Sequence, residues 1–139
     1  MSNVQFKWYS VVRNYELDSQ HIVNNATYIN YLEEARTNYV KHISMDIEEY
    51  FKDGFIFVVA GLEIMYFESL RGQDAYFVTV RITGNDERRI HFAQEIRREK
   101  DNNLLAKATV HMACIDHKTG KVAMPDKLRA QLSQILLKG

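Results

Sequence analysis

The sequence has little of several features that would narrow its class. It contains one cysteine, Cys114, so it can form no internal disulfide and no metal site built from several cysteines. One proline and six glycines, beside 46% hydrophobic residues, are unlike the composition of a disordered chain. No apolar run approaches the roughly 18 residues of a membrane span, and the charged N-terminal stretch lacks a signal peptide's apolar segment. We therefore expect one soluble domain over residues 1–139, in the cytoplasm and without a membrane partner.

Net charge is also absent, because 18 basic residues balance 18 acidic ones. The two halves differ: residues 1–70 carry 5 basic and 10 acidic residues, and residues 71–139 carry 13 and 8. A nucleic-acid-binding domain is usually basic overall, so we expect no nucleic-acid partner. The basic second half permits a local anion site, although two solvated faces of opposite sign explain the same counts.

Helical and strand-like periodicities alternate along the chain. Apolar residues three or four apart, among them Ile29 and Leu32, predict one face of a long helix over residues 25–43. Asn24 or Asn25 is a suitable N-cap for this helix. The other predicted elements are strands over residues 4–13, 55–70, 75–84, 89–99 and 104–116, and helices over residues 46–53 and 126–137. A strand, a long helix and a four-stranded meander predict an α+β fold with a mainly antiparallel five-stranded sheet.

Residues 55–70 are apolar at both odd and even positions. Such a strand is covered on both faces, which one layer of helix cannot achieve in a small antiparallel sheet. We therefore expect the chain to form a homodimer or homotetramer through the sheet.

Residues 15–31 contain the most informative polar side chains. Asp18 lies seven residues before Asn25, in a loop that leads into the start of the long helix. Free backbone N–H groups and the positive end of the helix dipole can stabilise an oxyanion there. A carboxylate beside such a donor suits acyl transfer, as nucleophile or as base for a water. Spacing alone favours a capping or loop aspartate at Asp18 over a catalytic one.

The same segment resembles the hot-dog-fold thioesterases of the 4-hydroxybenzoyl-CoA thioesterase type. The matching residues are an aspartate, a valine five residues later and a helix start with tyrosine, glutamate and arginine: Asp18, Val23, Asn25, Tyr28, Glu33 and Arg36. The similarity continues through LEIMYFESLRGQDAYFVTVRI and FAQEIRREKDNNLLAKATVHMACID to the terminal helix. It implies a hot-dog fold, with the sheet wrapped around the long helix, and hydrolysis of acyl-CoA or acyl-carrier-protein thioesters.

The resemblance also implies roles for individual residues. Asp18 matches the catalytic carboxylate, and Asn25 matches the residue whose backbone N–H polarises the thioester carbonyl. His21 departs from the family pattern, which has glycine there, so the loop geometry is in question. No cofactor is implied, because coenzyme A or phosphopantetheine enters as part of the substrate. Expected substrate contacts, including arginines for the carrier's phosphates, are Asn24, His21, Tyr28, Arg89, Arg97 and Arg98.

Other interpretations of these residues stay open. The arginines equally suit an exposed strand face. Tyr28, on a central helix, is more typical of the core, and His21 is more typical of a solvent-exposed loop. The histidines lack ligand spacing, so we expect no metal site. Glu33 and Arg36 predict an ion pair on the helix, and Cys114 a small buried side chain. The main alternative function is non-catalytic binding of an acyl thioester. A hot-dog dehydratase is less favoured, because this sequence lacks the signatures usual in that class.

Overall fold

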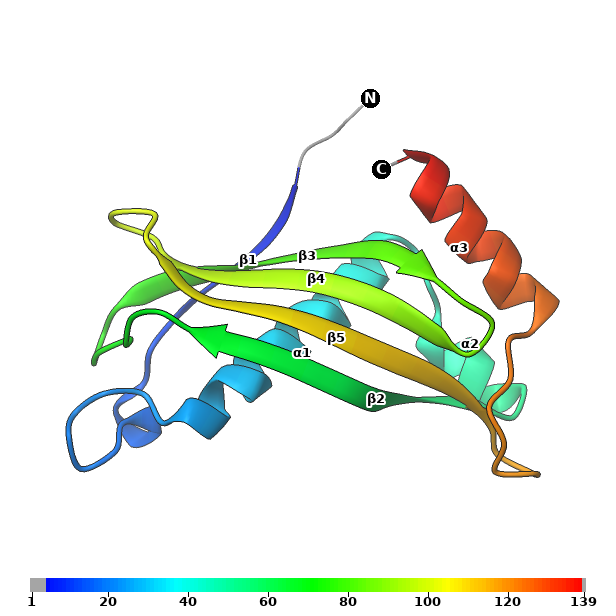
Figure 1. Cartoon of the computed structure of the whole chain (residues 1–139), viewed down its shortest axis with the longest axis horizontal. Helices are drawn as coiled ribbons and strands as arrows, with labels where there is room; N and C mark the ends of the chain where they lie inside the picture. The colour runs from blue at the N-terminus through cyan, green and yellow to red at the C-terminus, as the bar shows by residue number, and fades with distance from the viewer. Residues whose placement is uncertain (1–4, 139) are drawn as a thin grey trace.

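One antiparallel sheet and a long helix against one of its faces organise this structure, a computed structural model that describes residues 5–138 (Figure 1). The strands are β1 (Phe6–Val11), β2 (Phe55–Tyr66), β3 (Ala75–Asn85), β4 (Arg89–Arg98) and β5 (Leu104–Asp116). The helices are α1 (Asn25–His42), α2 (Ile47–Lys52), α3 (Asp126–Lys138) and the short 3₁₀ helix η1 (Asn14–Glu16). The predicted elements are confirmed to within a few residues, and residue 4 of the first predicted strand lies outside the described residues.

The strand order is β1-β3-β4-β5-β2, and all neighbouring strands are antiparallel. The predicted four-stranded meander is therefore wrong: β3, β4 and β5 form one, but β2 lies beyond β5 at the sheet edge. The connection over residues 67–74 is too long for a hairpin loop of two to five residues. It passes the end of β5 instead, where the Phe67 and Glu68 amides donate to Leu105 O at 2.8 and 3.3 Å.

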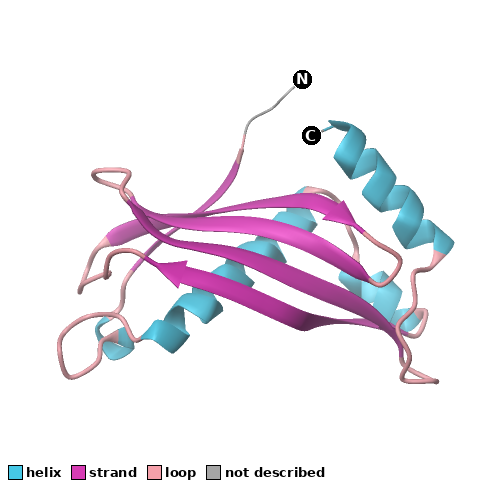
Figure 2. Ribbon diagram, in the orientation of Figure 1, coloured by secondary structure: helices cyan, strands magenta, loops and turns pink. Residues whose placement is uncertain are grey.

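Helix α1 crosses behind the sheet in the view of Figure 2 and supplies much of the core. Its buried residues are Tyr28, Tyr31, Leu32, Ala35, Arg36 and Tyr39. The prediction for Ile29 is wrong, since this side chain is 38% exposed. Tyr28 and Tyr31 point inward in its place because their hydroxyl groups find partners there: Tyr28 accepts from Leu70 N, and Tyr31 donates to Glu16. The long helix and the sheet that wraps it form the hot-dog fold implied by the resemblance.

A buried polar contact fixes α1 on the sheet. Arg36 Nη1 donates to Gln94 Oε1 of β4 at 3.0 Å, and Gln94 Nε2 donates to Leu32 O at 3.0 Å. Burial lowers the pKa of the Arg36 guanidinium, and the charge of Glu33 partly opposes that shift. The predicted Glu33–Arg36 ion pair is wrong, because Arg36 points into the sheet and Glu33 is exposed. A charged group so placed needs its hydrogen-bond partner, which Gln94 provides.

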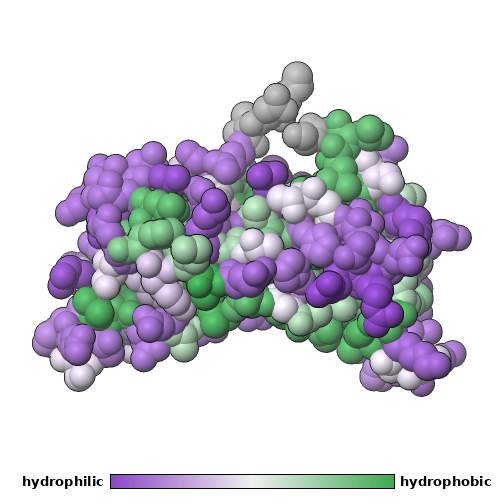
Figure 3. Space-filling view, in the orientation of Figure 1, coloured by the Kyte–Doolittle hydropathy of each residue, from purple (hydrophilic) through white to green (hydrophobic). Residues whose placement is uncertain are grey.

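Strand β2 leaves apolar side chains at the open edge of the sheet. Val59 is 48% exposed, Met65 62% and Phe67, just beyond the strand, 51%. Figure 3 shows apolar surface at the lower edge of the molecule, where β2 lies. The two-sided apolar pattern of the sequence is thus only partly covered by this chain. No helix within residues 5–138 is long and apolar enough to cross a membrane.

Candidate active site

Asp18 stands at the first corner of a tight hairpin between η1 and α1. This segment, residues 17–23, belongs to the loop at the lower left of Figure 1. Leu17 pairs with Val23, and Asp18 N donates to Ile22 O at 2.8 Å. The carboxylate oxygen Asp18 Oδ1 accepts from Gln20 N at 2.8 Å, which closes the turn. Within residues 5–138, the second carboxylate oxygen, Oδ2, makes no hydrogen bond. The turn therefore holds one oxygen in place and leaves the other free to act.

His21 adopts the left-handed backbone conformation, with φ of 64°. This is the conformation that glycine takes most easily, and an L side chain there costs about 1–2 kcal/mol. The turn is nevertheless formed, since His21 N donates to Asp18 O at 3.0 Å. Histidine at the family's glycine position therefore still permits a hydrogen-bonded turn. The His21 side chain is exposed, and its role as a substrate contact or second base stays a prediction.

The hairpin is attached to the rest of the fold by backbone hydrogen bonds. Val23 N donates to Leu70 O at 2.9 Å, and Ile22 forms a bridge with Arg71. Asn24 N donates to Glu16 O at 3.3 Å, so the two arms of the hairpin stay together up to the start of α1. The connection between β2 and β3 therefore positions Asp18 and the helix start as one unit.

The first turn of α1 presents one free amide. Asn24 is the N-cap: its Oδ1 accepts from Ala26 N at 2.8 Å, and its carbonyl oxygen accepts from Thr27 N at 2.9 Å. The Asn25 amide makes no hydrogen bond to any residue that the structure describes. Tyr66, from the end of β2, donates its hydroxyl proton to Asn25 O at 2.9 Å. The N–H of Asn25 is thus available to an external acceptor at the positive end of the helix dipole.

The tyrosines of α1 are packed rather than open. Tyr28 is 2% exposed, and burial raises the pKa of its hydroxyl, opposed by the hydrogen bond from Leu70 N. The Tyr31 hydroxyl donates to Glu16 Oε1 at 2.7 Å, and burial, with that hydrogen bond second, raises its pKa far above the ordinary value. Tyr28 is therefore packed beneath the start of α1, and its predicted contact with substrate stays a prediction.

The predicted arginines lie at two ends of β4. Arg97 and Arg98 are at the end near the hairpin, whereas Arg89 is at the other end, about 26 Å away for eight residues of strand. Arg97 is paired with Glu95 at 2.9 Å. Arg98 lies among three carboxylates, Asp101 at 2.9 Å, Glu68 at 3.4 Å and Asp74 at 3.6 Å. These internal partners compete with any phosphate for the two guanidinium groups.

Sequence reasoning missed two residues beside the hairpin. Arg71 carries an exposed guanidinium next to Ile22, and Tyr66 reaches Asn25 from the sheet edge. Both follow from the path of the connection after β2, which places residues 66–71 against the start of α1. No local pattern could have indicated them.

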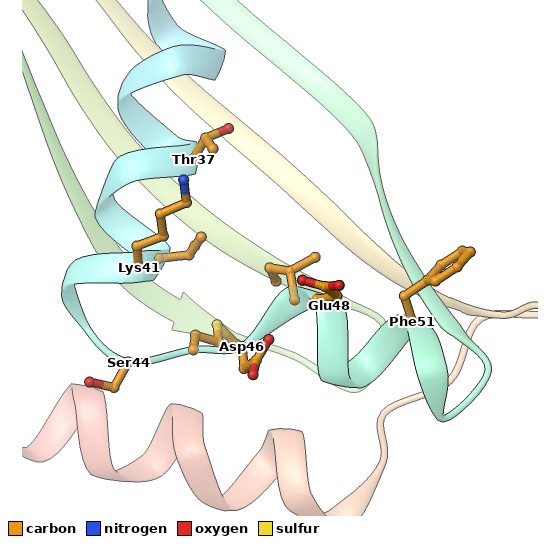
Figure 4. A pocket seen from close by; sticks show the side chains of 9 residues that line it. Thr37, Lys41, Ser44, Asp46, Glu48 and Phe51 are labelled. Carbon is orange, nitrogen blue, oxygen red and sulfur yellow. The ribbon is translucent and has the colours of Figure 1, made fainter.

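A groove of about 810 Å³ lies at the opposite end of α1, between this helix and α2 (Figure 4). Val40, Met45, Ile47 and Phe51 line it with apolar atoms, and Lys41 and other polar residues form part of its wall. Helix α1 has 18 residues and is therefore about 27 Å long. The groove and Asn25 lie at opposite ends of this length. Within one chain, the groove is therefore remote from Asp18.

Comparison with known proteins places this geometry in a family. The family model described as the thioesterase-like superfamily matches residues 12–132. The chain belongs to this superfamily. Among known proteins, the long-chain acyl-CoA thioesterase FadM of Escherichia coli K12 is 31% identical over 126 residues, 90% of this chain and 95% of that protein. The hairpin, the helix start and strands β2 to β5 lie within residues 12–132, and β1 precedes them.

Two other comparisons also cover most of the chain. The chloroplastic acyl-acyl carrier protein thioesterase ATL3 of Arabidopsis thaliana is 29% identical over 125 residues, which are 90% of this chain but only 66% of ATL3. The crystal structure of YbaW, a probable thioesterase from Escherichia coli, superposes with a TM-score of 0.82 at 30% identity. That match covers 94% of this chain and 98% of YbaW, so the two folds agree over nearly their whole lengths.

Proposed function

We propose that this protein hydrolyses acyl thioesters of coenzyme A or of acyl-carrier protein to a carboxylic acid and a thiol. The observation that carries the proposal is the free Asn25 amide beside a hairpin that leaves one oxygen of Asp18 unbonded. Membership of the thioesterase-like superfamily, and the names of the similar proteins FadM and ATL3, support the same reaction.

The two groups would divide the chemistry between them. The Asn25 N–H would bind the thioester carbonyl oxygen and stabilise the negative charge that develops when the carbonyl carbon is attacked. Asp18 would either attack that carbon, giving a mixed anhydride that water then hydrolyses, or take a proton from the attacking water. In both routes the C–S bond breaks and the carrier leaves as a thiol. No resident cofactor enters either route.

Substrate contacts follow from the same placement. Asn24 and His21 flank the free amide and the turn, and Tyr28 supports the helix start from below. The carrier's phosphates would meet basic residues, for which the predicted candidates are Arg97, Arg98 and Arg89. Exposed Arg71 joins these candidates because it lies against the hairpin.

We further propose that the working form is a homodimer or homotetramer. The exposed apolar side chains of β2 and its open strand edge would then be covered by a second copy of the chain. Static light scattering at micromolar concentration tests this assembly directly. A monomeric mass would contradict it. A cytoplasmic location stays a prediction.

The function is tested by thiol release from a panel of acyl-CoAs of graded chain length and ring content, with the same acyl groups also offered on a carrier protein. Turnover of any member at a rate above the uncatalysed reaction supports the proposal, and the preferred member identifies acyl group and carrier. Binding of several acyl-CoAs without turnover would favour the non-catalytic acyl-binding alternative instead.

A further inference from the structure

Two histidines meet on the sheet face opposite α1, where the proposed reaction uses neither. His91 of β4 and His111 of β5 are direct cross-strand partners. Their Nδ1 atoms are 2.7 Å apart, and their rings stand edge to face with centroids 4.9 Å apart. About a quarter of each side chain is exposed to solvent. The pair is thus partly buried, with the two Nδ1 atoms directed at each other.

Glycines of the neighbouring strands flank the two histidines on both sides. Gly61 of β2 lies opposite His111, and Gly84 of β3 lies opposite His91. Both glycines stand at register shifts of their strands. A Cβ atom at Gly61 would come within 3.3 Å of His111 Cδ2, so a larger residue would crowd the ring. One row across four strands therefore reads glycine, histidine, histidine, glycine.

Each ring's other nitrogen faces a carboxylate. His91 Nε2 lies 3.1 Å from Asp86 Oδ2, and His111 Nε2 lies 3.2 Å from Glu63 Oε1. The amides of Arg88 and Arg89 donate to Asp86 Oδ1 at 2.7 Å each. These two hydrogen bonds, with a smaller effect of His91, hold the pKa of Asp86 below its ordinary value. The residues Asp86, His91, His111 and Glu63 are called the histidine array below.

Counting protons identifies the charge state in which every ring nitrogen of the histidine array takes part in a hydrogen bond. An ionised carboxylate only accepts hydrogen bonds, so Nε2 of both rings must carry a proton. Two neutral imidazoles would then turn bare Nδ1 lone pairs toward each other at 2.7 Å. One added proton converts that contact into a hydrogen bond, whereas two added protons would oppose two N–H groups.

We propose that His91 and His111 together bind one excess proton, and that this proton couples the edge strand β2 to the β3–β4 turn through Glu63 and Asp86. The charged residues nearest to His91 on this face are Arg89, two residues before it on β4, and Arg81 of β3, opposite Ala93. Farther along the same face lie Glu95 and Lys107, which are cross-strand partners four residues from the histidines, and Arg97. On β5, the nearest residues of this face, Thr109 and Ala113, carry no charge. The two guanidinium groups oppose uptake of a second proton.

A metal ion between the two Nδ1 atoms, the alternative to a shared proton, has less support. Among residues 5–138, no group of three or more His, Cys, Asp or Glu side chains could hold a metal. Two imidazole nitrogens bound to one zinc at tetrahedral angles would be about 3.3 Å apart, for Zn–N bonds of 2.0–2.1 Å. The observed 2.7 Å separation is that of a hydrogen bond.

The excess proton makes the contribution of the histidine array to stability depend on pH. In the unfolded chain two independent imidazoles, with ordinary pKa values near ~6.5, carry almost two excess protons at pH 5 and almost none at pH 8.5. The folded pair carries one. Below about pH 6.5 the unfolded chain therefore binds more protons and stability falls with decreasing pH; above it the folded chain binds more and stability falls with increasing pH.

Nuclear magnetic resonance of the full chain with ¹⁵N-labelled histidine tests the proton count. At pH 6.5 we expect three N–H protons on the four ring nitrogens of the pair, with both Nε2 atoms protonated. His117→Gln, in an exposed turn, is the control and should leave these signals unchanged. Two rings that titrate independently would overturn the proposal. So would ring signals that change on treatment with EDTA, because a metal would then lie between the nitrogens.

A double-mutant cycle tests the coupling. His91→Gln, His111→Gln and the double variant are unfolded with denaturant at fixed protein concentration at pH 5, 6.5 and 8.5. We expect the coupling factor between the two sites, in the unfolding equilibrium constant, to be at least ~5-fold larger at pH 6.5 than at either other pH. A factor that is the same at all three pH values would overturn the proposal. If the variants do not fold, the spectroscopic experiment on the unmodified chain still decides it.

Discussion

Asp18→Asn is the substitution that separates chemistry from folding at the proposed site. The asparagine keeps an Oδ1 acceptor for Gln20 N, so the turn that positions the side chain should survive. It removes the negative charge and the basic, nucleophilic oxygen. We expect turnover to fall at least ~100-fold, which corresponds to about 2.7 kcal/mol in the activation barrier. The free energy of unfolding should change by no more than about 0.5 kcal/mol.

The measurement is thiol release under saturating acyl-CoA, together with denaturant unfolding of the same samples. Asp116→Asn is a matched control, because the Asp116 carboxylate also closes a turn, accepting from Lys118 N at 2.9 Å, but at the far end of β5. It should leave turnover unchanged. A loss in Asp18→Asn confined to KM would reduce Asp18 to a substrate-positioning residue. Unchanged kinetics would refute the site.

Three other substitutions and one chemical treatment test the same structure. Asn25→Ala keeps the backbone amide and should lower turnover at most ~10-fold. Asn24→Ala removes the N-cap and should lower the free energy of unfolding by about 1 kcal/mol. Kinetics and denaturant unfolding of both variants check this, and a loss of stability in Asn25→Ala but not in Asn24→Ala would contradict the assignment of the cap. His21→Gly should raise the free energy of unfolding by about 1 kcal/mol in the same unfolding experiment, since glycine tolerates the positive φ; destabilisation would contradict the turn. Burial raises the pKa of Cys114 to about 11, so this thiol should react with a disulfide reagent at pH 8 only after unfolding, and rapid labelling of the folded protein would be inconsistent with its position.

The sequence predicted the individual strands and helices better than it predicted which strands pair with each other. Alternation along residues 75–84 and 104–116 identified strands whose inward residues are buried, because a half-buried strand leaves a period of two in its own sequence. The place of β2 beyond β5 left no such local trace. It depends on a long connection and on hydrogen bonds to Leu105, which is more than thirty residues away along the chain.

The sequence predicted those parts of the candidate site whose residues are close together along the chain. Asp18, the capping Asn24 and the amide of Asn25 lie within eight residues, so turn and capping preferences apply to them directly. The partners of Arg36 and His91 were not predictable in this way. Gln94 and His111 meet them only through packing and strand register, and the helix pattern favoured Glu33 as the partner of Arg36.

The position of β2 at the edge also affects how the chain folds as it is made. β3, β4 and β5 are joined by consecutive hairpins and can pair as soon as each is synthesised. Within residues 5–138, β2 pairs with β5 alone, and all of β3 and β4 is synthesised between these two strands. At about 5–20 residues per second, it waits on the order of seconds for β5. During that time, one of the most apolar segments of the nascent chain has no strand beside it. The late closure of β2 onto β5 is therefore the step at which chaperones or a neighbouring nascent chain compete with folding.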